Sequence, residues 1–373
     1  MKERIAVLGA NEPLIPFYRQ AKALCYEVIG IAIENGAVCK PYCDRFYPVS
    51  FADKDQVVEI CRHEKVDGIL SFSLESALPT VVYVAQKLGL VSNSQESVDM
   101  TQSKFAQRQA LETAGIPVPN YYLVESTADL EKVQCRFPVI VKPVDSGGSQ
   151  GICKVETPER LVEAYHYAVE YSRTSKAIVE EFVDGREFSV EYISHKGKHY
   201  FLQITDKVTS GAPRFVEMQH HQPAAIPESV LERIKKMVEG ALTALKIENS
   251  ASHTEIKWNS KDELFIIETG ARMGGDYIAS DLVRLSTGYD FVEGAIKLAV
   301  NRFEVPMFTN AMYSGVYFYS KLAPEIGEVI RNHKNYPEIV EYEIDEGPLC
   351  EVLSNADRNG YLIYHSTNGK LSL

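Results

Sequence analysis

The sequence lacks the features that mark disulfide-stapled, secreted and membrane-spanning proteins. Its seven cysteines are an odd number without paired spacing, so we expect reduced thiols rather than a disulfide framework. Cys39 and Cys43 are separated by three residues, but no second Cys or His pair completes a zinc site. No apolar run approaches the length that spans a bilayer, and residues 1–5 show no basic region leading into a long apolar stretch. We therefore expect a cytoplasmic protein without a membrane partner.

Basic residues are also scarce. Lys and Arg number 39 against 51 Asp and Glu, a net charge of −12, whereas nucleic-acid binding needs clustered positive charge. We therefore expect no nucleic-acid partner, although a local basic pocket for a small anion is compatible with this charge. The loop at 9–13 (GANEP), after the first apolar run, lacks the GxGxxG spacing of a dinucleotide site. No Ser/His/Asp or Cys/His arrangement and no internal repeat stands out.

The sequence does contain the composition of a globular protein and a regular alternation of strand-like and helix-like segments. Of its 373 residues, 45% are hydrophobic and 24% charged, and the length suggests two or three domains. In the first hundred residues the strand-like segments are 4–9, 28–33 and 67–72, and the helix-like segments are 14–25, 57–63 and 78–88. This alternation predicts a Rossmann-like parallel sheet that is covered on both faces and lacks a phosphate loop.

Beyond a polar break at 91–99 the pattern changes. The later segments predict a helix at 104–115, a strand–glycine loop–strand hairpin at 138–155, strands at 177–182, 187–194 and 200–205, a helix at 229–246, and a second hairpin at 252–268. Short strands and turns from 306 onward predict a small closing subdomain. We therefore divide the chain into a domain at 1–98, a domain at 99–305 with a flexible lid at about 121–190, and a subdomain at 306–373.

The loop at 145–151 (DSGGSQG) is the first candidate binding element. Gly147 and Gly148 let backbone N–H groups approach a bound phosphate, and Ser149 can add a hydroxyl. Lys142, at the end of the preceding strand, would supply a point charge. The alternative interpretation is a flexible hairpin turn with a solvated lysine.

The segment 179–188 (VEEFVDGREF) is the second candidate. It combines a strand that ends in carboxylates, a turn at Asp184-Gly185 and a returning Glu187. This arrangement suits adenosine recognition, with backbone groups on the adenine edge and Glu187 on the ribose hydroxyls. The alternative is an ordinary β-turn flanked by surface acids.

Two acids on the second predicted hairpin form the third candidate. Glu255 alternates with bulky neighbours in HTEIK (253–257), and four apolar residues lead into Glu268 in LFIIE (264–268). Two carboxylates on neighbouring strands repel each other unless a divalent cation lies between them. Hard carboxylate ligands suit Mg²⁺, which also binds through nucleotide phosphates. The alternative is that each acid is solvated at a strand end.

Arg272 is the fourth candidate, four residues after Glu268 and shortly before two glycines. Its planar guanidinium could contact a phosphoryl group during transfer, or it could be an exposed arginine on a glycine-rich turn. Lys207 is interpreted either as a further phosphate contact or as a solvated lysine. His220 and His221 either border an acceptor pocket or are exposed loop histidines.

The order of these features, from about 104 to 299, resembles the ATP-grasp superfamily. The resemblance implies a mixed α/β and α+β architecture, in which a Rossmann-like domain precedes an ATP-grasp fold and a small C-terminal subdomain. It implies that Lys104 and Lys142 contact the ATP phosphates, under the loop that contains Gly147, Gly148 and Ser149. Adenine would be bound by Glu180, Glu181, Phe182 and Val183, and the ribose by Glu187. Glu255 and Glu268 would bind Mg²⁺ or Mn²⁺, and Lys142 and Arg272 would act in phosphoryl transfer.

Two stretches, HTEIK (253–257) and ETGARMGGDYI (268–278), are most similar to bacterial L-amino-acid ligases. Gly270 stands where many superfamily members carry an asparagine metal ligand, a departure that this subgroup shares. The resemblance implies an ADP-forming ligase that joins a small-molecule carboxylate and an amine through an acyl phosphate, with amino-acid-like substrates. The alternatives are a ligase similar to carbamoyl-phosphate synthase or glycinamide-ribonucleotide synthetase, and a nucleotide-binding module without turnover. The sequence leaves open whether the protein forms a homodimer.

Overall fold

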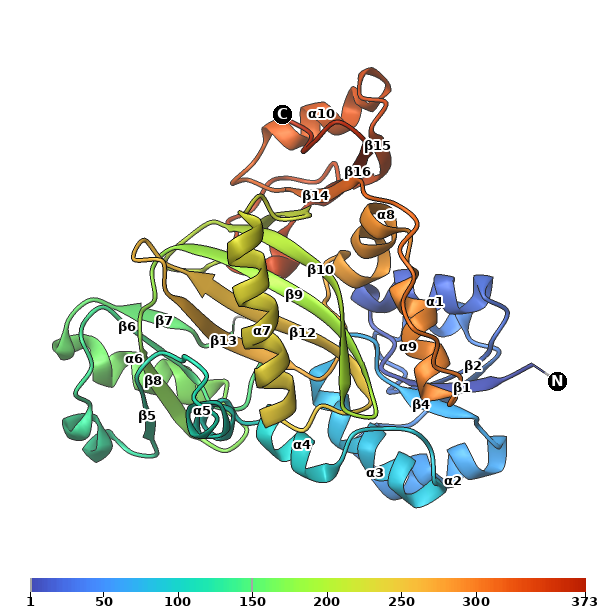
Figure 1. Ribbon diagram of the computed structural model, residues 1–373, viewed down its shortest axis with the longest axis horizontal. Coiled ribbons are helices and arrows are strands. Elements are labelled where there is room, and N and C mark those ends of the chain that lie inside the picture. Colours follow the sequence, from blue (N-terminus) through green and yellow to red (C-terminus); the bar gives the residue numbers. More distant parts are fainter. Residues whose placement is uncertain (1, 149) are drawn as a thin grey trace.

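The computed structural model describes residues 2–148 and 150–373, which form three sheets and their covering helices (Figure 1). Ser149, a candidate phosphate contact, lies outside the described residues. Within the two described ranges, no helix is both long enough and apolar enough to cross a bilayer.

The N-terminal sheet is parallel, with the strand order β3-β2-β1-β4. Its strands are β1 (Arg4–Leu8), β2 (Glu27–Ala32), β3 (Arg45–Pro48) and β4 (Gly68–Leu70), and its helices are α1 (Ile15–Ala23), α2 (Lys54–Glu64) and α3 (Leu78–Leu88). The predicted alternation of strands and helices is therefore confirmed. The edge strand β3 was not predicted, because its partly exposed residues carry no apolar run.

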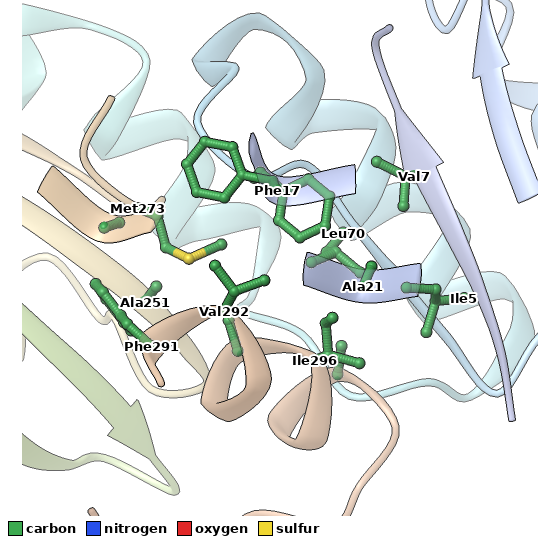
Figure 2. Close-up of a cluster of buried hydrophobic side chains, with 14 of the residues drawn as sticks. Ile5, Val7, Phe17, Ala21, Leu70, Ala251, Met273, Phe291, Val292 and Ile296 are labelled. Atoms are coloured by element: carbon green, nitrogen blue, oxygen red, sulfur yellow. The ribbon is translucent and has the colours of Figure 1, made fainter. Parts of the chain in front are cut away.

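Two different parts of the chain cover the two faces of this sheet. Ala6 and Leu8 of β1 pack against α2 and α3, whereas Ile5 and Val7 pack against α1 and α9 (Phe291–Ala299). Figure 2 shows this second core, in which side chains of α1 and α9 lie side by side. Because α9 lies far along the chain, the segments predicted as 1–98 and 99–305 share one hydrophobic core. The boundary between them stays a prediction.

The expected break at 91–99 is wrong in part, because it contains the start of α4 (Gln95–Thr101). The side chain of Ser94 caps this helix by accepting a hydrogen bond from the backbone N–H of Ser97 at 3.2 Å, and Val98 is buried. Helix α5 (Lys104–Thr113) follows.

A second sheet is antiparallel, with the order β5-β8-β6-β7. Its strands are β5 (Tyr121–Val124), β6 (Val139–Pro143), β7 (Cys153–Val155) and β8 (Ala177–Glu181), and α6 (Leu161–Glu170) packs against it. β6 and β7 pair in the register Val141–Cys153, so the predicted hairpin around the glycine loop is confirmed.

The central sheet has eight strands in the order β13-β12-β9-β10-β11-β14-β16-β15. Their bounds are β9 (Arg186–His195), β10 (Lys198–Thr209), β11 (Glu217–Gln222), β12 (Ser250–Trp258), β13 (Leu264–Gly270), β14 (Tyr313–Tyr319), β15 (Ile339–Ile344) and β16 (Gly360–Ser366). Helix α7 (Glu228–Ala244) lies along one face (Figure 1) and packs on Val190. Because side chains alternate along a strand, Ser189 and Glu191 point to the opposite face.

The segment predicted as a C-terminal subdomain continues the central sheet. β14 pairs with β11, for example at Tyr317–Gln219, and β16 then pairs with β14. Helix α10 (Glu325–Arg331) packs beside these strands, and α8 (Val283–Thr287) leads from the region after β13 toward α9. The strands after 306 thus do not form a sheet of their own, and the three-part division stays a prediction.

Candidate active site

The face of the central sheet opposite α7 carries four of the predicted site residues. Lys207 of β10 lies directly opposite Glu187 of β9, and Glu255 of β12 lies directly opposite Glu268 of β13. Directly opposed residues in antiparallel strands point to the same face. Four neighbouring strands therefore place charged side chains on one surface.

Lys207 is buried at the centre of this surface, with 7% of its area exposed. Its Nζ lies 2.6 Å from Glu255 Oε1, 2.7 Å from Glu217 Oε1 and 3.3 Å from Glu187 Oε1. Burial opposes the charge, but the three carboxylates outweigh it and raise the pKa of Lys207 well above its usual value. The interpretation as a solvated lysine is wrong, and contact with phosphate stays a prediction. Glu217 was missed, because a single acid in the polar strand β11 has no informative spacing.

Each of the two predicted metal ligands has a lysine partner. Lys207 holds Glu255, and the Nζ of Lys104 lies 3.0 Å from Glu268 Oε1. Burial opposes the ionised form of Glu255, but Lys207 and His253 outweigh it and hold the pKa of Glu255 well below its usual range. The interpretation of Glu255 and Glu268 as acids simply solvated at strand ends therefore does not describe this surface.

The donor set fits a metal ion that is shared with a nucleotide. Among residues 2–148 and 150–373, no group of three or more His, Cys, Asp or Glu is arranged to hold a metal ion. Two opposed carboxylates suit Mg²⁺, which keeps several waters and takes phosphate oxygens as further ligands. Glu255 and Glu268 are thus the residues that would hold the ion, and this assignment stays a prediction.

His253 and Glu191 form a buried pair on the same face of the sheet, next to Glu255. His253 Nδ1 lies 2.6 Å from Glu191 Oε1, and His253 Nε2 lies 3.6 Å from Glu255 Oε1. Burial opposes protonation of His253, but Glu191 outweighs it and raises the pKa of His253 to about 9. A Cβ at Gly274 would lie 2.8 Å from His253 Nδ1, so only glycine lets the turn after Arg272 pass this close.

Lys142 is not the solvated lysine of the alternative interpretation. It is 5% exposed, and its Nζ lies 2.6 Å from Glu180 Oε2. Arg108, fully buried on α5, donates from Nε to Glu180 Oε1 at 2.6 Å and was not predicted from the sequence. Burial opposes ionisation of Glu180, but the two cations outweigh it and lower the pKa of Glu180 to about 2. Phosphate contact by Lys142 stays a prediction.

The predicted adenine segment begins at this ion pair. The backbone N–H groups of Glu181 and Phe182 donate to Asn120 O at 2.9 Å and Pro138 O at 3.0 Å, whereas the N–H of Val183 has no such partner in the described parts of the chain. Of the backbone groups predicted to contact adenine, the N–H of Val183 and the carbonyl oxygens of this segment therefore stay candidates. The alternative of an ordinary β-turn flanked by surface acids does not describe Glu180, because its side chain is only 4% exposed.

The ring of Phe182 lies within cation–π distance of two ammonium groups. Lys154 Nζ and Lys257 Nζ lie 4.5 Å and 5.2 Å from the ring centre. Lys257 also lies 3.7 Å from Glu187, the predicted ribose contact. This corner therefore connects the second sheet to the charged face of the central sheet.

Arg272 lies at the edge of the same surface and is partly buried, with 19% of its side chain exposed. Its Nη1 donates to Met273 O at 3.1 Å, and its Nη2 lies 3.8 Å from Glu75 Oε2. Glu75, in the turn after β4, was not predicted from the sequence. The Nζ of Lys104 donates to Ser146 O at 2.6 Å, so the glycine loop reaches the same place. The structure thus brings Lys104, Glu268, Arg272 and the loop together.

His220 and His221 are buried on β11, so the alternative that they are exposed loop histidines is wrong. His220 Nε2 lies 3.5 Å from Glu217 Oε2, whereas His221 Nδ1 lies 3.0 Å from the hydroxyl of Tyr364. Burial lowers the pKa of His221 to about 2, so it is neutral. Of the two, only His220 borders the charged surface.

The C-terminal segment contributes two residues, Arg358 and Asn355, to the rim of this surface. Arg358 donates to both carboxylate oxygens of Asp276, from Nη2 at 2.7 Å and from Nη1 at 2.9 Å. Asn355 Nδ2 lies 3.3 Å from both Glu217 Oε2 and Asp276 Oδ2. No sequence spacing relates these residues, because they meet only through the pairing of β11, β14 and β16.

Comparison with known proteins identifies the domain that carries most of this surface. Residues 135–281 match the ATP-grasp domain family. D-alanine–D-alanine ligase of Enterococcus faecalis is 31% identical over 180 residues, which is 45% of this chain and 50% of that protein. The crystal structure of L-amino acid ligase from Bacillus licheniformis superposes with a TM-score of 0.83 at 23% identity, covering 98% of this chain and 94% of that chain.

A structure of phosphoribosylglycinamide synthetase from Anaerococcus prevotii superposes with a TM-score of 0.76 at 19% identity, over 99% of this chain and 95% of that chain. The chain spans about half the length of curated relatives that it matches, 49% for an uncharacterized protein of Sinorhizobium fredii and 50% for the D-alanine–D-alanine ligase.

Residues 135–281 thus match the ATP-grasp domain, and nearly the whole chain shares its fold with the two ligase structures. Among solved structures that share this fold is the L-amino acid ligase, so the resemblance drawn from the motifs is confirmed at the level of the domain and the fold. The named relatives and neighbours are ligases and a synthetase, the enzyme class that the motifs predict.

Proposed function

We propose that the protein is an ADP-forming ligase that joins a carboxylate and an amine, with amino-acid-like substrates. The observation that carries this proposal is that Lys104 joins the glycine loop to Glu268, which lies opposite Glu255. Arg272 lies next to the loop, beside Glu75. Phosphate oxygens, a divalent cation and a reacting carboxylate all need opposite charges, and this surface supplies both signs.

The residues present suit the first half-reaction, attack of a carboxylate oxygen on the γ-phosphorus of ATP. Bound Mg²⁺ would supply charge neutralisation at the phosphates. Lys104 and Lys142 would hold phosphate oxygens, and Glu255 and Glu268 would position the ion. The guanidinium of Arg272 would donate to the transferring phosphoryl group, because its planar fork of N–H groups matches phosphoryl oxygens.

In the second half-reaction an amine attacks the carbonyl carbon of the acyl phosphate. Arg272 would then stabilise the oxyanion that develops on the carbonyl oxygen. The likeness to D-alanine–D-alanine ligase and to L-amino acid ligase supports amino-acid-like substrates for this step. A purely nucleotide-binding module would have no need for Arg272 beside paired acids.

ADP release with Mg²⁺ present tests the proposal, using a panel of amino-acid pairs, bicarbonate with simple amines, and phosphorylated sugar amines. Release that requires both a carboxylate and an amine supports it. Release only with bicarbonate, or only with phosphorylated sugar amines, would favour the carbamoyl-phosphate-synthase-like or the synthetase-like alternative. ATP binding without release on any pair would favour the binding module.

A matched pair of variants ties the activity to this surface. Lys104→Met should remove ADP release, because Lys104 is the lysine that joins the glycine loop to Glu268. Lys236→Met, on the exposed side of α7, should leave it unchanged.

A further inference from the structure

Glu75 has an environment that distinguishes it from the other acids of the site. It begins a short turn, Glu75–Ala77, at the carboxyl end of β4 in the N-terminal sheet. Its side chain is 20% exposed, so its carboxylate is reachable although its surroundings are largely protein. Its Oε2 lies 3.8 Å from Arg272 Nη2 and would lie 3.7 Å from a Cβ placed on Gly147. Glu75 therefore stands between Arg272 and the glycine loop.

The other acids of the site are each held by a closer cation. The shortest distances between nitrogen and oxygen are 2.6 Å for Glu180, 2.6 Å for Glu255, 2.7 Å for Glu217, 2.7 Å for Asp276, 3.0 Å for Glu268 and 3.3 Å for Glu187. In the described parts of the chain, no hydrogen bond reaches the carboxylate of Glu75. Its backbone carbonyl accepts from Gln102 Nε2 and from the backbone N–H of Leu78.

The charges that face Glu75 come from several elements. Arg272 follows β13, Lys104 starts α5, and Glu268 and Glu255 lie on β13 and β12. Burial is the largest influence on Glu75 and raises its pKa, and the two acids add to this effect while Arg272 and Lys104 oppose it. A reachable carboxylate that is weakly paired has the capacity to accept a proton.

We propose that Glu75 is the residue that accepts the proton of the attacking amine in the second half-reaction, an inference that rests on the proposed function. Glu75 takes a proton from the substrate ammonium and leaves a lone pair on nitrogen. The C–N bond then forms at the acyl carbon, and the C–O bond to phosphate breaks. Phosphate leaves with the bonding pair and takes the second nitrogen proton, which yields the amide and hydrogen phosphate.

The need for such a base follows from the acceptor's chemistry. An aliphatic amino group is mostly protonated near neutral pH and has no lone pair in that form. Arg272 would bind the developing oxyanion, and Glu75 lies beside it, so the base and the oxyanion donor face the same carbonyl group. The N-terminal sheet would thereby supply a catalytic group and not only a support.

Hydroxylamine distinguishes a base for the amine from a residue that serves phosphoryl transfer or the fold. It is largely unprotonated at neutral pH and traps acyl phosphates as hydroxamates without a base. The experiment compares the parent with Glu75→Gln, measuring amide formation with the amine acceptor and hydroxamate formation with hydroxylamine. We expect amide formation to fall about a hundred- to ten-thousandfold while hydroxamate formation stays within a fewfold of the parent, as for loss of a general base. Glu12→Gln, in the exposed turn after β1, is the matched control and should change neither rate.

Equal losses with both nucleophiles would overturn the inference, because Glu75 would then serve phosphoryl transfer or the fold. Unchanged amide formation would overturn it as well. Glu75→Asp is the second variant should the glutamine variant be unstable, and its ratio of amide to hydroxamate formation should fall below that of the parent. If the parent forms no hydroxamate with any carboxylate, the proposed function itself fails, which is a distinct result.

Discussion

Glu255 and Glu268 lie directly opposite each other on β12 and β13, and a β-bulge follows immediately, because the next paired residues are Ile256 and Ile266. The bulge leaves Ile267 without a partner on β12, and its carbonyl accepts a hydrogen bond from Arg108 Nη2 at 2.5 Å. Bulges of this kind re-aim neighbouring side chains and are common beside active sites. Like charges that face each other destabilise a sheet, so this pair needs its lysines or a cation.

Glu268→Gln should abolish ADP formation and leave the fold intact. The substitution removes a charge from the predicted metal pair without opening a cavity, because the two side chains have nearly the same shape. ADP release, and Mn²⁺ binding followed by electron paramagnetic resonance with ADP present, measure the effect. Glu263→Gln, in the exposed turn between β12 and β13, is the control. Near-normal turnover at saturating Mg²⁺ would rule out the metal assignment.

Arg272→Lys should cut turnover about a hundred- to a thousandfold, the usual cost of losing a transition-state donor, and leave ATP affinity nearly unchanged. Lysine keeps the charge but loses the planar fork of donors. Calorimetry for ATP binding and ADP release for turnover, on one preparation, measure both. A loss confined to ATP affinity would recast Arg272 as a ground-state phosphate ligand, and unchanged turnover would remove it from the site.

His253→Gln should weaken Mn²⁺ binding in the presence of ADP by about 10–100-fold, the range for residues that orient metal ligands. The reason is that His253 connects the buried Glu191 to Glu255. His199→Gln is the matched control, because His199 is also hydrogen-bonded, to Ser194 and Thr243, but lies away from the charged surface. The same Mn²⁺ affinity in the parent and in His253→Gln would contradict this role.

Glu180→Gln should lower the free energy of unfolding by about 3–5 kcal/mol, because it leaves the buried cations Arg108 and Lys142 without their partner. Urea denaturation measures the loss. Glu163→Gln on α6 breaks an exposed ion pair with Arg160, which precedes the helix. It should change the free energy of unfolding by no more than about 0.5 kcal/mol. Similar losses in the two variants would show that the buried pair contributes no special stability.

The contribution of Glu180 to the free energy of unfolding should also depend on pH, and it should decrease in acid. Its pKa in the folded protein is lowered to about 2 from an ordinary value of 4.5. A lowered pKa means that the stabilisation is fully present above pH 4.5 and is lost as the pH falls toward 2. The difference in unfolding free energy between the parent and Glu180→Gln should therefore be constant near neutral pH and shrink in acid. A difference that grows in acid would contradict the ion-pair account.

The loop at 145–151 should be protected from proteolysis by an ATP analogue. Asp145 is already anchored, since its carboxylate accepts from Ser172 Oγ at 2.9 Å and from the backbone N–H of Thr174 at 3.0 Å. The glycines that follow have few apolar anchors and would gain contacts only from phosphate oxygens. Limited proteolysis with and without the analogue tests this, and equal cleavage rates in the loop would contradict it.

The strand faces of the site were predictable from local pattern. In β12 and β13 the alternation of polar and apolar residues and the short turn between the strands predict a hairpin that brings Glu255 and Glu268 together, and the observed register agrees. The same holds for the hairpin that carries Lys142 and the glycine loop. In both cases the contacts are close along the chain, so the spacing of residue types contains the information.

Partners that come from distant segments were not predictable. Arg108 and Glu75 reach Glu180 and Arg272 only after helices and sheets have packed, and Arg358 reaches Asp276 only because β16 pairs with β14. The burial of Lys207, which turned a nominal surface lysine into the centre of a charge network, depends on three other strands. Periodicity along one strand specifies which face a side chain occupies. The ionic partner that it meets there depends on strand order and helix packing, which bring together residues with no regular separation in the sequence.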